Sequence, residues 1–385
     1  MAKSRIYFVL GMLLIFTLQA SAGQKVSPKP EGGKVRTYYV AVDEVEWDYA
    51  PEGIDHMTGK PFEGYAKIHT ERGPHRIGTK YLKACYREYT DESFQKLKER
   101  KPEESYLGIV GPVLRAEVGD TINVLFKNNG THAFSMHPHG VAYEKPSEGT
   151  AYGGVPWEET GVVAPGKTHL YVWEVPERAG PRPTDPSSVV WLYHSHVQEP
   201  QDVNAGLIGA LVITRRGMAR ADGTPKDVDR EFVALFMAFN ESQSWYLDHN
   251  IATYTSDPKG VKTDDIIPVD GTGRYMLTGS GFGDTTIKWS MNGYIYGNMP
   301  KMTMKRNQHV RWYLVSLGDG FNFHTPHWHG NVVTTGGETT DVVNIGPAQM
   351  ITADMVPDKV GVWMFHCHVS DHMAAGMMTH YEVLP

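Results

Sequence analysis

Stretches in which apolar and polar side chains alternate recur along the chain and predict β-strands. The clearest is Val35–Asp48, which is rich in Val, Tyr and Trp, and residues 81–89 have the same character. Residues 108–128 read as two strands separated by a Gly-Asp turn signal at residues 117–120, and residues 164–167 (APGK) are a second turn signal. Short strands joined by such turns predict an all-β fold, a sandwich or a barrel.

One segment breaks the alternation and predicts a helix instead. Residues 91–100 (DESFQKLKER) surround Phe94 and Leu97 with charges and begin with an aspartate, a residue type that caps helices.

A polar stretch without strand character, residues 215–230, divides the chain. Residues 302–315, which are followed by a histidine cluster, resemble residues 113–126, which are followed by His137, so the second half repeats the first. A chain of 385 residues is long enough for two cores. We therefore expect one domain at residues 23–216, a linker at residues 217–229 and a second domain at residues 230–385.

The first 22 residues have the pattern of an export signal. Lys3 and Arg5 precede an apolar run at residues 6–18, and Ala-Ser-Ala at residues 20–22 forms a cleavage site. The run is short for a bilayer-spanning helix, so we expect a secreted or periplasmic protein with no membrane span. Loss of the two cations takes the formal net charge from -7 to about -9, which argues against a nucleic-acid partner.

The most informative residues lie near the C-terminus: His366, Cys367, His368, His372 and Met377. Soft sulfur combined with imidazole suits copper, and two His, one Cys and a weak Met ligand form a blue-copper centre. On an extended strand, the two histidines that flank Cys367 point away from it and remain free for a second metal centre. The chain has one other cysteine, Cys85, which we expect to be an unpaired buried residue on a strand.

Ten of the eighteen histidines fall in four short clusters. A single His-x-His motif fits a zinc site or a structural role equally well, but four clusters in this order predict a centre of several metal ions. The other eight histidines lack ligand spacing, and we expect them to be surface or hydrogen-bonded residues. The clusters are His137 and His139; His194 and His196; His324, His327 and His329; and His366, His368 and His372.

With these motifs the chain resembles a two-domain multicopper oxidase, similar to the two-domain laccases. Residues 193–197 (YHSHV) leading to residues 206–209 (GLIG) are closest to the ceruloplasmin and hephaestin branch. The resemblance covers nearly all of the chain after the export signal. It implies two cupredoxin-like Greek-key β-sandwich or barrel domains and about four copper ions per chain, of type 1, type 2 and binuclear type 3.

The resemblance also implies a role for each ligand and an overall reaction. A small reductant gives single electrons at the type 1 site, and dioxygen is reduced to water at a trinuclear cluster. The type 1 ligands are His324, Cys367, His372 and Met377; the type 2 ligands are His137 and His327; the type 3 ligands are His139, His194, His196, His329, His366 and His368.

One departure from larger relatives concerns Ser195, which stands where a blue-copper strand has a cysteine. The first domain therefore lacks a type 1 centre of its own and supplies half of a trinuclear cluster. Two domains cannot close the ring that joins such halves in larger relatives, whereas three copies of the chain can. We expect a homotrimer with clusters at its subunit interfaces.

Three further residues are candidates for catalysis. Tyr143 and Glu148 resemble the tyrosine and acid that two-domain laccases place after the first His-x-His motif for proton delivery. Asp371 matches the acid before the type 1 histidine in ceruloplasmin-type ferroxidases, or it orients a ligand loop. Asp284 is a second acidic candidate.

The reducing substrate is left open between a metal ion, Fe²⁺ or Cu⁺, and a phenol or aromatic amine. Trp289 replaces an expected histidine and Gly320 an expected acid, so the ferroxidase pattern is half kept. Two other functions are alternatives. A copper nitrite reductase needs the type 1 cysteine in its first domain, where this chain has Ser195, and a copper carrier has no use for the first-half histidines.

Overall fold

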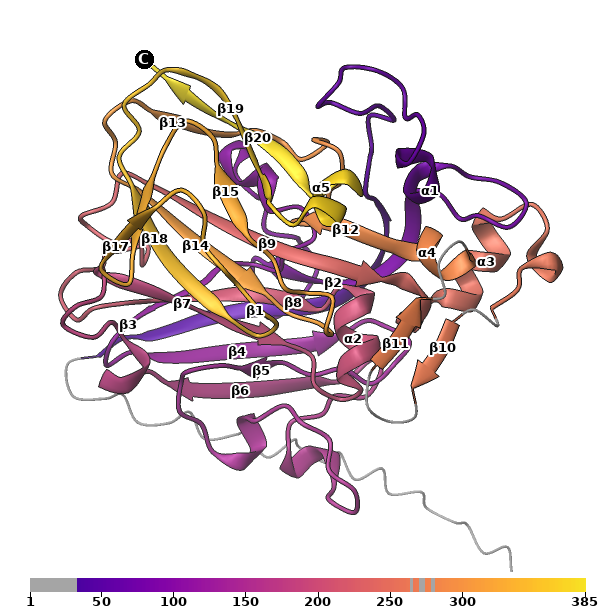
Figure 1. Ribbon diagram of the computed structural model, residues 1–385. Helices are drawn as coiled ribbons and strands as arrows, with labels where there is room; N and C mark the ends of the chain where they lie inside the picture. Colours follow the sequence, from indigo (N-terminus) through magenta and orange to yellow (C-terminus); the bar gives the residue numbers. More distant parts are fainter. Residues whose placement is uncertain (1–32, 264–265, 270–273, 278–280) are drawn as a thin grey trace, which may run out of the picture.

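The computed structural model describes residues 33–263, 266–269, 274–277 and 281–385. Within these residues the chain is built mainly from strands, which confirms the all-β prediction (Figure 1). The export signal predicted at residues 1–22 lies outside the described residues. None of the described helices is long and apolar enough to cross a membrane.

Residues 33–214, the first half, form two four-stranded sheets. β1 has the predicted bounds, the turn at residues 117–120 separates β3 from β4, and the turn at residues 164–167 precedes β6. One sheet has the order β2 (Lys80–Tyr89), β1 (Val35–Asp48), β4 (Thr121–Asn128) and β6 (Thr168–Glu174); the other has β3 (Leu114–Glu117), β8 (Ile208–Thr214), β7 (Ser188–His194) and β5 (His137–Pro138).

The described residues of the second half, residues 230–385, form a six-stranded sheet, a four-stranded sheet and a hairpin. In Figure 1 their orange-to-yellow strands lie beside the indigo-to-magenta strands of the first half. One sheet has the order β12 (Ile287–Met291), β9 (Arg230–Asn240), β14 (Val310–Ser316), β18 (Met350–Met355), β16 (Val333–Thr335) and β17 (Glu338–Thr340); the other has β13 (Met302–Lys305), β20 (Met378–Leu384), β19 (Gly361–Cys367) and β15 (Pro326–Trp328); the hairpin is β10 (Ile266–Val269) and β11 (Arg274–Leu277).

The two halves repeat the same strand pairings. β1 runs parallel to β4 as β9 runs parallel to β14, and β3 runs parallel to β8 as β13 runs parallel to β20. The short strands that carry His-x-His motifs also correspond, because β5 pairs with β7 as β15 pairs with β19. Residues 215–229 lie between β8 and β9 and contain no strand.

The sheet that carries the first-half histidines is covered on both faces. β7 packs against β14 and β18 of the second half, while β8 packs toward β2 of its own half. All seven residues of β8 are buried, and a continuous apolar run is what such a doubly covered strand requires.

The helices are short. They are α1 (Ala66–Thr70), α2 (Glu199–Ala205), α3 (Leu247–Tyr254), α4 (Phe282–Thr286) and α5 (Ser370–Ala374), with 3₁₀ turns η1 (Pro102–Leu107), η2 (Lys145–Ser147), η3 (Trp157–Glu159), η4 (Glu177–Ala179), η5 (Glu241–Gln243) and η6 (Pro258–Gly260).

The helix predicted at residues 91–100 is wrong. The Asp91 side chain accepts the N–H of Ser93 at 2.9 Å, which closes a local turn that competes with a helix. The segment then runs back along β2, where the N–H of Lys98 donates to the carbonyl of Glu88 at 2.8 Å. Phe94 packs its ring against Tyr89 and takes a positive φ of 52°, so burial of this ring prevails over helix propensity.

Cys85 lies on β2, is 6% exposed and has no disulfide partner. Burial raises the pKa of its thiol to about 12, so it stays protonated and unreactive. The prediction of a buried, unpaired cysteine is confirmed.

A fully buried ion pair joins the two halves. The Lys83 ammonium on β2 donates to the Glu241 carboxylate, which follows β9, and to the carbonyl of Asn204 at 2.8 Å. The hydroxyl of Tyr49 donates to the same carboxylate oxygen. Burial lowers the pKa of Lys83, and the charge of Glu241 opposes this effect. Each charge thus depends on the other for its stability in the core.

We expect Lys83→Met to lower the free energy of unfolding by about 3–5 kcal/mol, because it leaves Glu241 charged, buried and without its cation. The matched control is Lys98→Met, which removes an exposed partner of Glu88 and is expected to cost at most about 1 kcal/mol. Urea unfolding of the two variants measures the difference. Similar losses in the free energy of unfolding of both variants would show that the buried pair contributes no more to stability than the exposed pair.

Candidate metal centres

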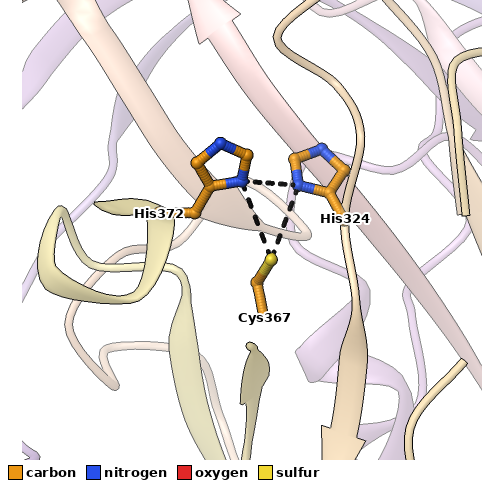
Figure 2. Close-up of side chains that lie close together, drawn as sticks. All are labelled: His324, Cys367 and His372. Carbon is orange, nitrogen blue, oxygen red and sulfur yellow. Dashed lines mark hydrogen bonds between the residues drawn. The ribbon is translucent and has the colours of Figure 1, made fainter. Parts of the chain in front are cut away.

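Three side chains from different elements converge on one point in the second half. The sulfur of Cys367 lies 3.9 Å from Nδ1 of His324 and 3.7 Å from Nδ1 of His372, and these two nitrogens are 3.2 Å apart (Figure 2). All three residues are buried. One sulfur and two imidazole nitrogens that face each other are a donor set that suits copper.

The local fold explains this convergence. Cys367 ends β19, His372 lies on α5 immediately after it, and His324 is held opposite by two backbone hydrogen bonds with Ile345. Met377, the fourth predicted ligand, is fully buried at the start of β20. Its carbonyl accepts the N–H of Cys367, and its own N–H donates to the carbonyl of His372, both at 3.0 Å. The backbone therefore keeps all four predicted residues together.

Two neighbours orient the imidazoles of this group. Nε2 of His324 lies 3.2 Å from Oδ1 of Asn322, which also accepts the N–H of Ala238 and so acts as an acceptor. The proton of His324 is then on Nε2, and Nδ1 is free to bind a metal. The ring of Trp289 stacks on His372 with centroids 4.0 Å apart.

Burial sets the protonation of the group. It lowers the pKa of His324 to about 3 and of His372 to about 4, so both rings are neutral at neutral pH. Burial raises the pKa of Cys367. The thiol therefore loses its proton only when a cation binds, and metal binding at this group releases a proton.

The histidines that flank Cys367 belong to a second group on the other side of the strand. Nε2 of His366 lies 3.2 Å from Nδ1 of His327 and 3.0 Å from Nε2 of His329. The ring of His368 lies 5.1 Å from that of His327. Because side chains alternate along a strand, Cys367 and its two neighbours face opposite ways. Burial lowers the pKa of His366 to about 4.

The first half holds a matching group of four imidazoles. Nε2 of His139 lies 3.1 Å from Nε2 of His194, and the ring of His137 lies 5.2 Å from that of His196. Burial lowers the pKa of His137, His139 and His194, that of His139 to about 4. Neutral imidazoles whose rings crowd together in this way are suited to share metal ions.

Backbone carbonyls orient three imidazole rings of the two groups in the same way. Nδ1 of His137 donates to the carbonyl of Glu148 at 2.7 Å, Nδ1 of His194 to that of Ser195 at 3.1 Å, and Nδ1 of His366 to that of Cys367 at 2.8 Å. Each bond places the proton on Nδ1 and leaves Nε2 as the free ligand atom.

The two imidazole groups belong to different sheets, the first to the sheet of β5 and β7 and the second to that of β15 and β19. Among the described residues, no hydrogen bond or ring contact links the first-half group to the second-half group. Each group offers four imidazoles, half of the eight that the predicted trinuclear cluster requires. The sequence places His137, His139, His194 and His196 in the first group and His327, His329, His366 and His368 in the second, and the structure brings each set together.

The first half keeps the backbone of a sulfur-copper site but not its ligands. The N–H of Ser195 donates to the carbonyl of Leu207 at 3.2 Å, as the N–H of Cys367 donates to that of Met377. Phe134 precedes His137 by three residues, as His324 precedes His327. Serine, leucine and phenylalanine thus replace cysteine, methionine and histidine, so the first half offers no soft donor set at this position.

The candidate proton-delivery residues lie beside the first-half group. The ring of Tyr143 is 6.0 Å from that of His137, and the carbonyl of Glu148 orients the same histidine. The carboxylate of Glu148 accepts hydrogen bonds from Lys145 and from Tyr152. Burial raises the pKa of Glu148, but these bonds outweigh burial and lower it overall. Glu148 is therefore a carboxylate at neutral pH, a proton acceptor rather than a donor.

The acidic candidates lie on two short helices of the second half. Asp371 is exposed on α5 and Asp284 is half-buried on α4. Burial raises the pKa of Tyr65, and the charges of Asp371 and Asp284 raise it further. His372 is 8% exposed and His324 1%, which makes His372 the imidazole nearer to solvent. Gly320, where an acid was expected, is exposed.

Sequence reasoning missed the residues that support the ligands. Asn322 and Asp202 have no distinctive spacing, although Asp202 follows Ser195 by only seven positions. Trp289 was recognised as a replacement for histidine, but its stacking on His372 depends on the packing of β12 against β9 and on the loop that carries α5.

Two family models, both described as multicopper oxidase, match residues 107–217 and 267–385. Hephaestin of Mus musculus is 38% identical over 92% of this chain and 30% of its own length, and ferroxidase HEPHL1 of Mus musculus is 40% identical over 91% and 29%. Ceruloplasmin of Homo sapiens is 38% identical over 97% and 35%. The chain thus spans about a third of the length of these relatives.

A solved structure described as a multicopper oxidase aligns over 92% of this chain and 90% of its own, with a TM-score of 0.56 and 19% identity. This likeness concerns the fold and confirms the predicted cupredoxin-like architecture. The two matching family models and the sequence identity with hephaestin and ceruloplasmin show the family as well as the fold. The chain belongs to the multicopper oxidase family, in the branch that contains hephaestin and ceruloplasmin.

Proposed function

We propose that this protein couples one-electron oxidation of a reductant to the reduction of dioxygen to water. The observation that carries the proposal is the tripeptide at residues 366–368, whose thiol belongs to one donor group and whose flanking imidazoles belong to another. Copper, the cofactor of this family, supplies the redox chemistry when it is bound at these donors.

Residues of the chain connect the Cys367 group to the second-half imidazole group and keep water away from the Cys367 group. Besides the covalent backbone, the hydrogen bond from Nδ1 of His366 to the carbonyl of Cys367 gives a second route between the groups. Burial of Cys367 and His324 excludes water from the group that contains Cys367. The neutral rings of His324, His372 and His366 need not lose protons before they bind metal.

Metal analysis together with oxygen uptake tests the proposal. We expect about four copper ions per chain on the family pattern and oxygen consumption with Fe²⁺, Cu⁺ or a phenol as reductant. A single copper per chain without oxygen uptake would identify a copper carrier instead.

For the reductant, we propose a metal ion, with Fe²⁺ as the first candidate. Asp371 precedes His372 on α5, its charge acts on His372, and its charge and that of Asp284 both act on Tyr65. Carboxylates are favoured ligands of hard and borderline cations. One relative of this chain is named a ferroxidase. The expected histidine is Trp289 here, so the site has fewer donors, and we expect at best a modest preference for Fe²⁺.

We expect Asp371→Ala to reduce Fe²⁺ oxidation several-fold more than phenol oxidation, because it removes an anionic ligand but leaves His372 in place. Steady-state oxygen uptake with each reductant measures the ratio. The matched control is Asp358→Ala, an exposed acid outside the site, which should leave both rates unchanged. Equal losses on both reductants would assign Asp371 to the structure of the ligand loop.

A second candidate is the oxidation of phenols or aromatic amines. Phe323, next to His324, is 63% exposed and offers an aromatic surface beside the buried, stacked rings of Trp289 and His372. An arene can pack against such a surface without a dedicated metal-binding site.

We propose that Tyr143 and Glu148 help to move protons to the first-half imidazole group. Their support is the contact of Tyr143 with His137 and the carboxylate state of Glu148. The Oε atoms of Glu148 would accept a proton that arrives from solvent through Tyr152 or Lys145.

We further propose a homotrimer in which each cluster forms between two subunits. Its support is the division of the imidazoles between two sheets, since each group holds only half of the required ligands. A head-to-tail contact repeated three times closes a ring and brings the first-half group of one subunit to the second-half group of the next. The pattern of residues 1–22 supports export of this assembly, to the periplasm or the medium.

A further inference from the structure

A buried carboxylate lies behind the first-half imidazole group. Asp202 on α2 is 0% exposed and accepts four hydrogen bonds. Its Oδ2 accepts the hydroxyl of Ser195 at 2.7 Å and the N–H groups of Val197 and Gln198 at 3.0 and 3.1 Å, and its Oδ1 accepts the indole N–H of Trp245 at 2.8 Å. Among the described residues it has no ion-pair partner. A buried carboxylate held only by neutral donors is costly to desolvate, so these bonds must offset a large penalty.

Three of these four donors belong to the segment that carries His194 and His196. Ser195 lies between the two histidines, and Val197 and Gln198 follow directly. Asp202 therefore holds the backbone and side chain of this segment at three places within four residues. Movement of the segment would turn both imidazoles, because their rings project from the same short stretch of chain.

The same network reaches the other histidine pair. The hydroxyl oxygen of Ser195 accepts the N–H of Ser135 at 3.0 Å, and Oγ of Ser135 accepts the N–H of His196 at 3.0 Å. Ser135 precedes His137 by two residues. The two segments that carry the first-half ligands are thus fixed to each other through two serines, and Asp202 anchors one of those serines.

Comparison with the second half shows what Asp202 replaces. There the N–H of Thr325 approaches the sulfur of Cys367 at 3.4 Å, as the N–H of Ser135 approaches the oxygen of Ser195. Cys367 is a candidate metal ligand, whereas Ser195 has a carboxylate as its partner. In the first half an aspartate anchors the strand end where the second half has a metal-binding group.

The fourth donor, Trp245, links Asp202 to the second half. Trp245 follows β9, stacks on His132 of the first half with ring centroids 4.3 Å apart, and donates to Asp202. The adjacent Tyr246 donates to Glu44 on β1 at 2.9 Å. Docking of the second half thus helps to fix the carboxylate.

We propose that Asp202 is a positioning residue for copper at the first-half imidazole group, acting through Ser195 and the backbone of residues 197–198. This inference rests on the proposed role of His194 and His196 as copper ligands. Trp245 is the second-half partner that keeps the carboxylate in place.

The test uses the full-length, copper-loaded protein with Asp202→Asn. The amide has one acceptor oxygen in place of two, so it cannot satisfy both the 195–198 segment and Trp245. We expect copper affinity at the imidazole cluster to fall about 10–100-fold, the usual effect of losing a partner behind metal ligands. Chelator titration followed by analysis of the copper retained, with the blue absorption accounting for copper at Cys367, measures this affinity. The blue absorption from Cys367 should remain and shows that the second half is folded.

Glu199→Gln is the matched control, an acid-to-amide change on the same helix that touches neither Ser195 nor Trp245, and it should leave the affinity unchanged. If Asp202→Asn fails to fold, Trp245→Phe keeps the stacking on His132 and removes only the donor, and it should lower the affinity in the same direction. Unchanged affinity in the folded variants, with only a lower unfolding midpoint of the copper-free protein, would overturn the inference. Absence of cluster copper from the unmodified protein would instead overturn the proposed function.

Discussion

Cys367→Ser is expected to abolish the blue absorption of the copper-loaded protein and to reduce oxygen uptake to the background rate. The sulfur of Cys367 lies within 3.9 Å of both imidazole nitrogens of its group, and a serine oxygen is a poor substitute for a soft thiolate. The same change removes the sulfur that joins the electron-accepting group to the backbone leading to His366 and His368. Absorption spectroscopy and oxygen uptake measure the two effects.

The chain offers a matched control in its other cysteine. Cys85→Ser changes the same atom at a buried position on β2, away from the ligand groups, and should keep both colour and activity. Copper retained by Cys367→Ser at the imidazole groups would show that only one centre was lost. A Cys367→Ser protein that remains blue would disprove the assignment of this residue.

Two inactive variants are expected to restore activity when they are refolded together. His137→Ala/His139→Ala breaks the first-half group, and His366→Ala/His368→Ala breaks the second-half group, so each variant alone should lack intact clusters. In a mixed trimer, an intact first-half group can meet an intact second-half group across an interface. Random assembly of equal amounts makes about a quarter of the clusters intact, and oxygen uptake should recover in proportion.

A chain that carries all four substitutions is the control and should give no activity in any mixture with itself. Copper at the interface should also stabilise the trimer, because it binds the assembled form and not separate chains. A fully active monomer in light scattering, or mixed trimers without any recovery, would contradict shared clusters.

Local sequence patterns predicted much of the fold. Alternation in Val35–Asp48 predicted a strand with the bounds of β1, and the Gly-Asp turn signal placed the break between β3 and β4. Local signals failed at residues 91–100, where helix propensity competed with an Asp91 turn and the burial of Phe94. Short segments with mixed signals are decided by the surface they pack against, which the local sequence does not contain.

The sequence by itself also determined the chemistry of the candidate site. Copper favours cysteine, histidine and methionine, and the alternation of a strand separates Cys367 from His366 and His368 without reference to other segments. Substitution of Ser195 for cysteine likewise showed that the first half has no sulfur centre.

Only the tertiary structure decided which groups meet and what holds them. Asp202 and Trp245 are 43 positions apart, yet they share a hydrogen bond that anchors the first-half ligands. Stacking of Trp289 on His372 also arises from a contact between distant segments. Ligand identity and strand alternation are properties of consecutive residues, whereas burial, ring stacking and shared carboxylates depend on chain segments that become neighbours only when the two halves pack together.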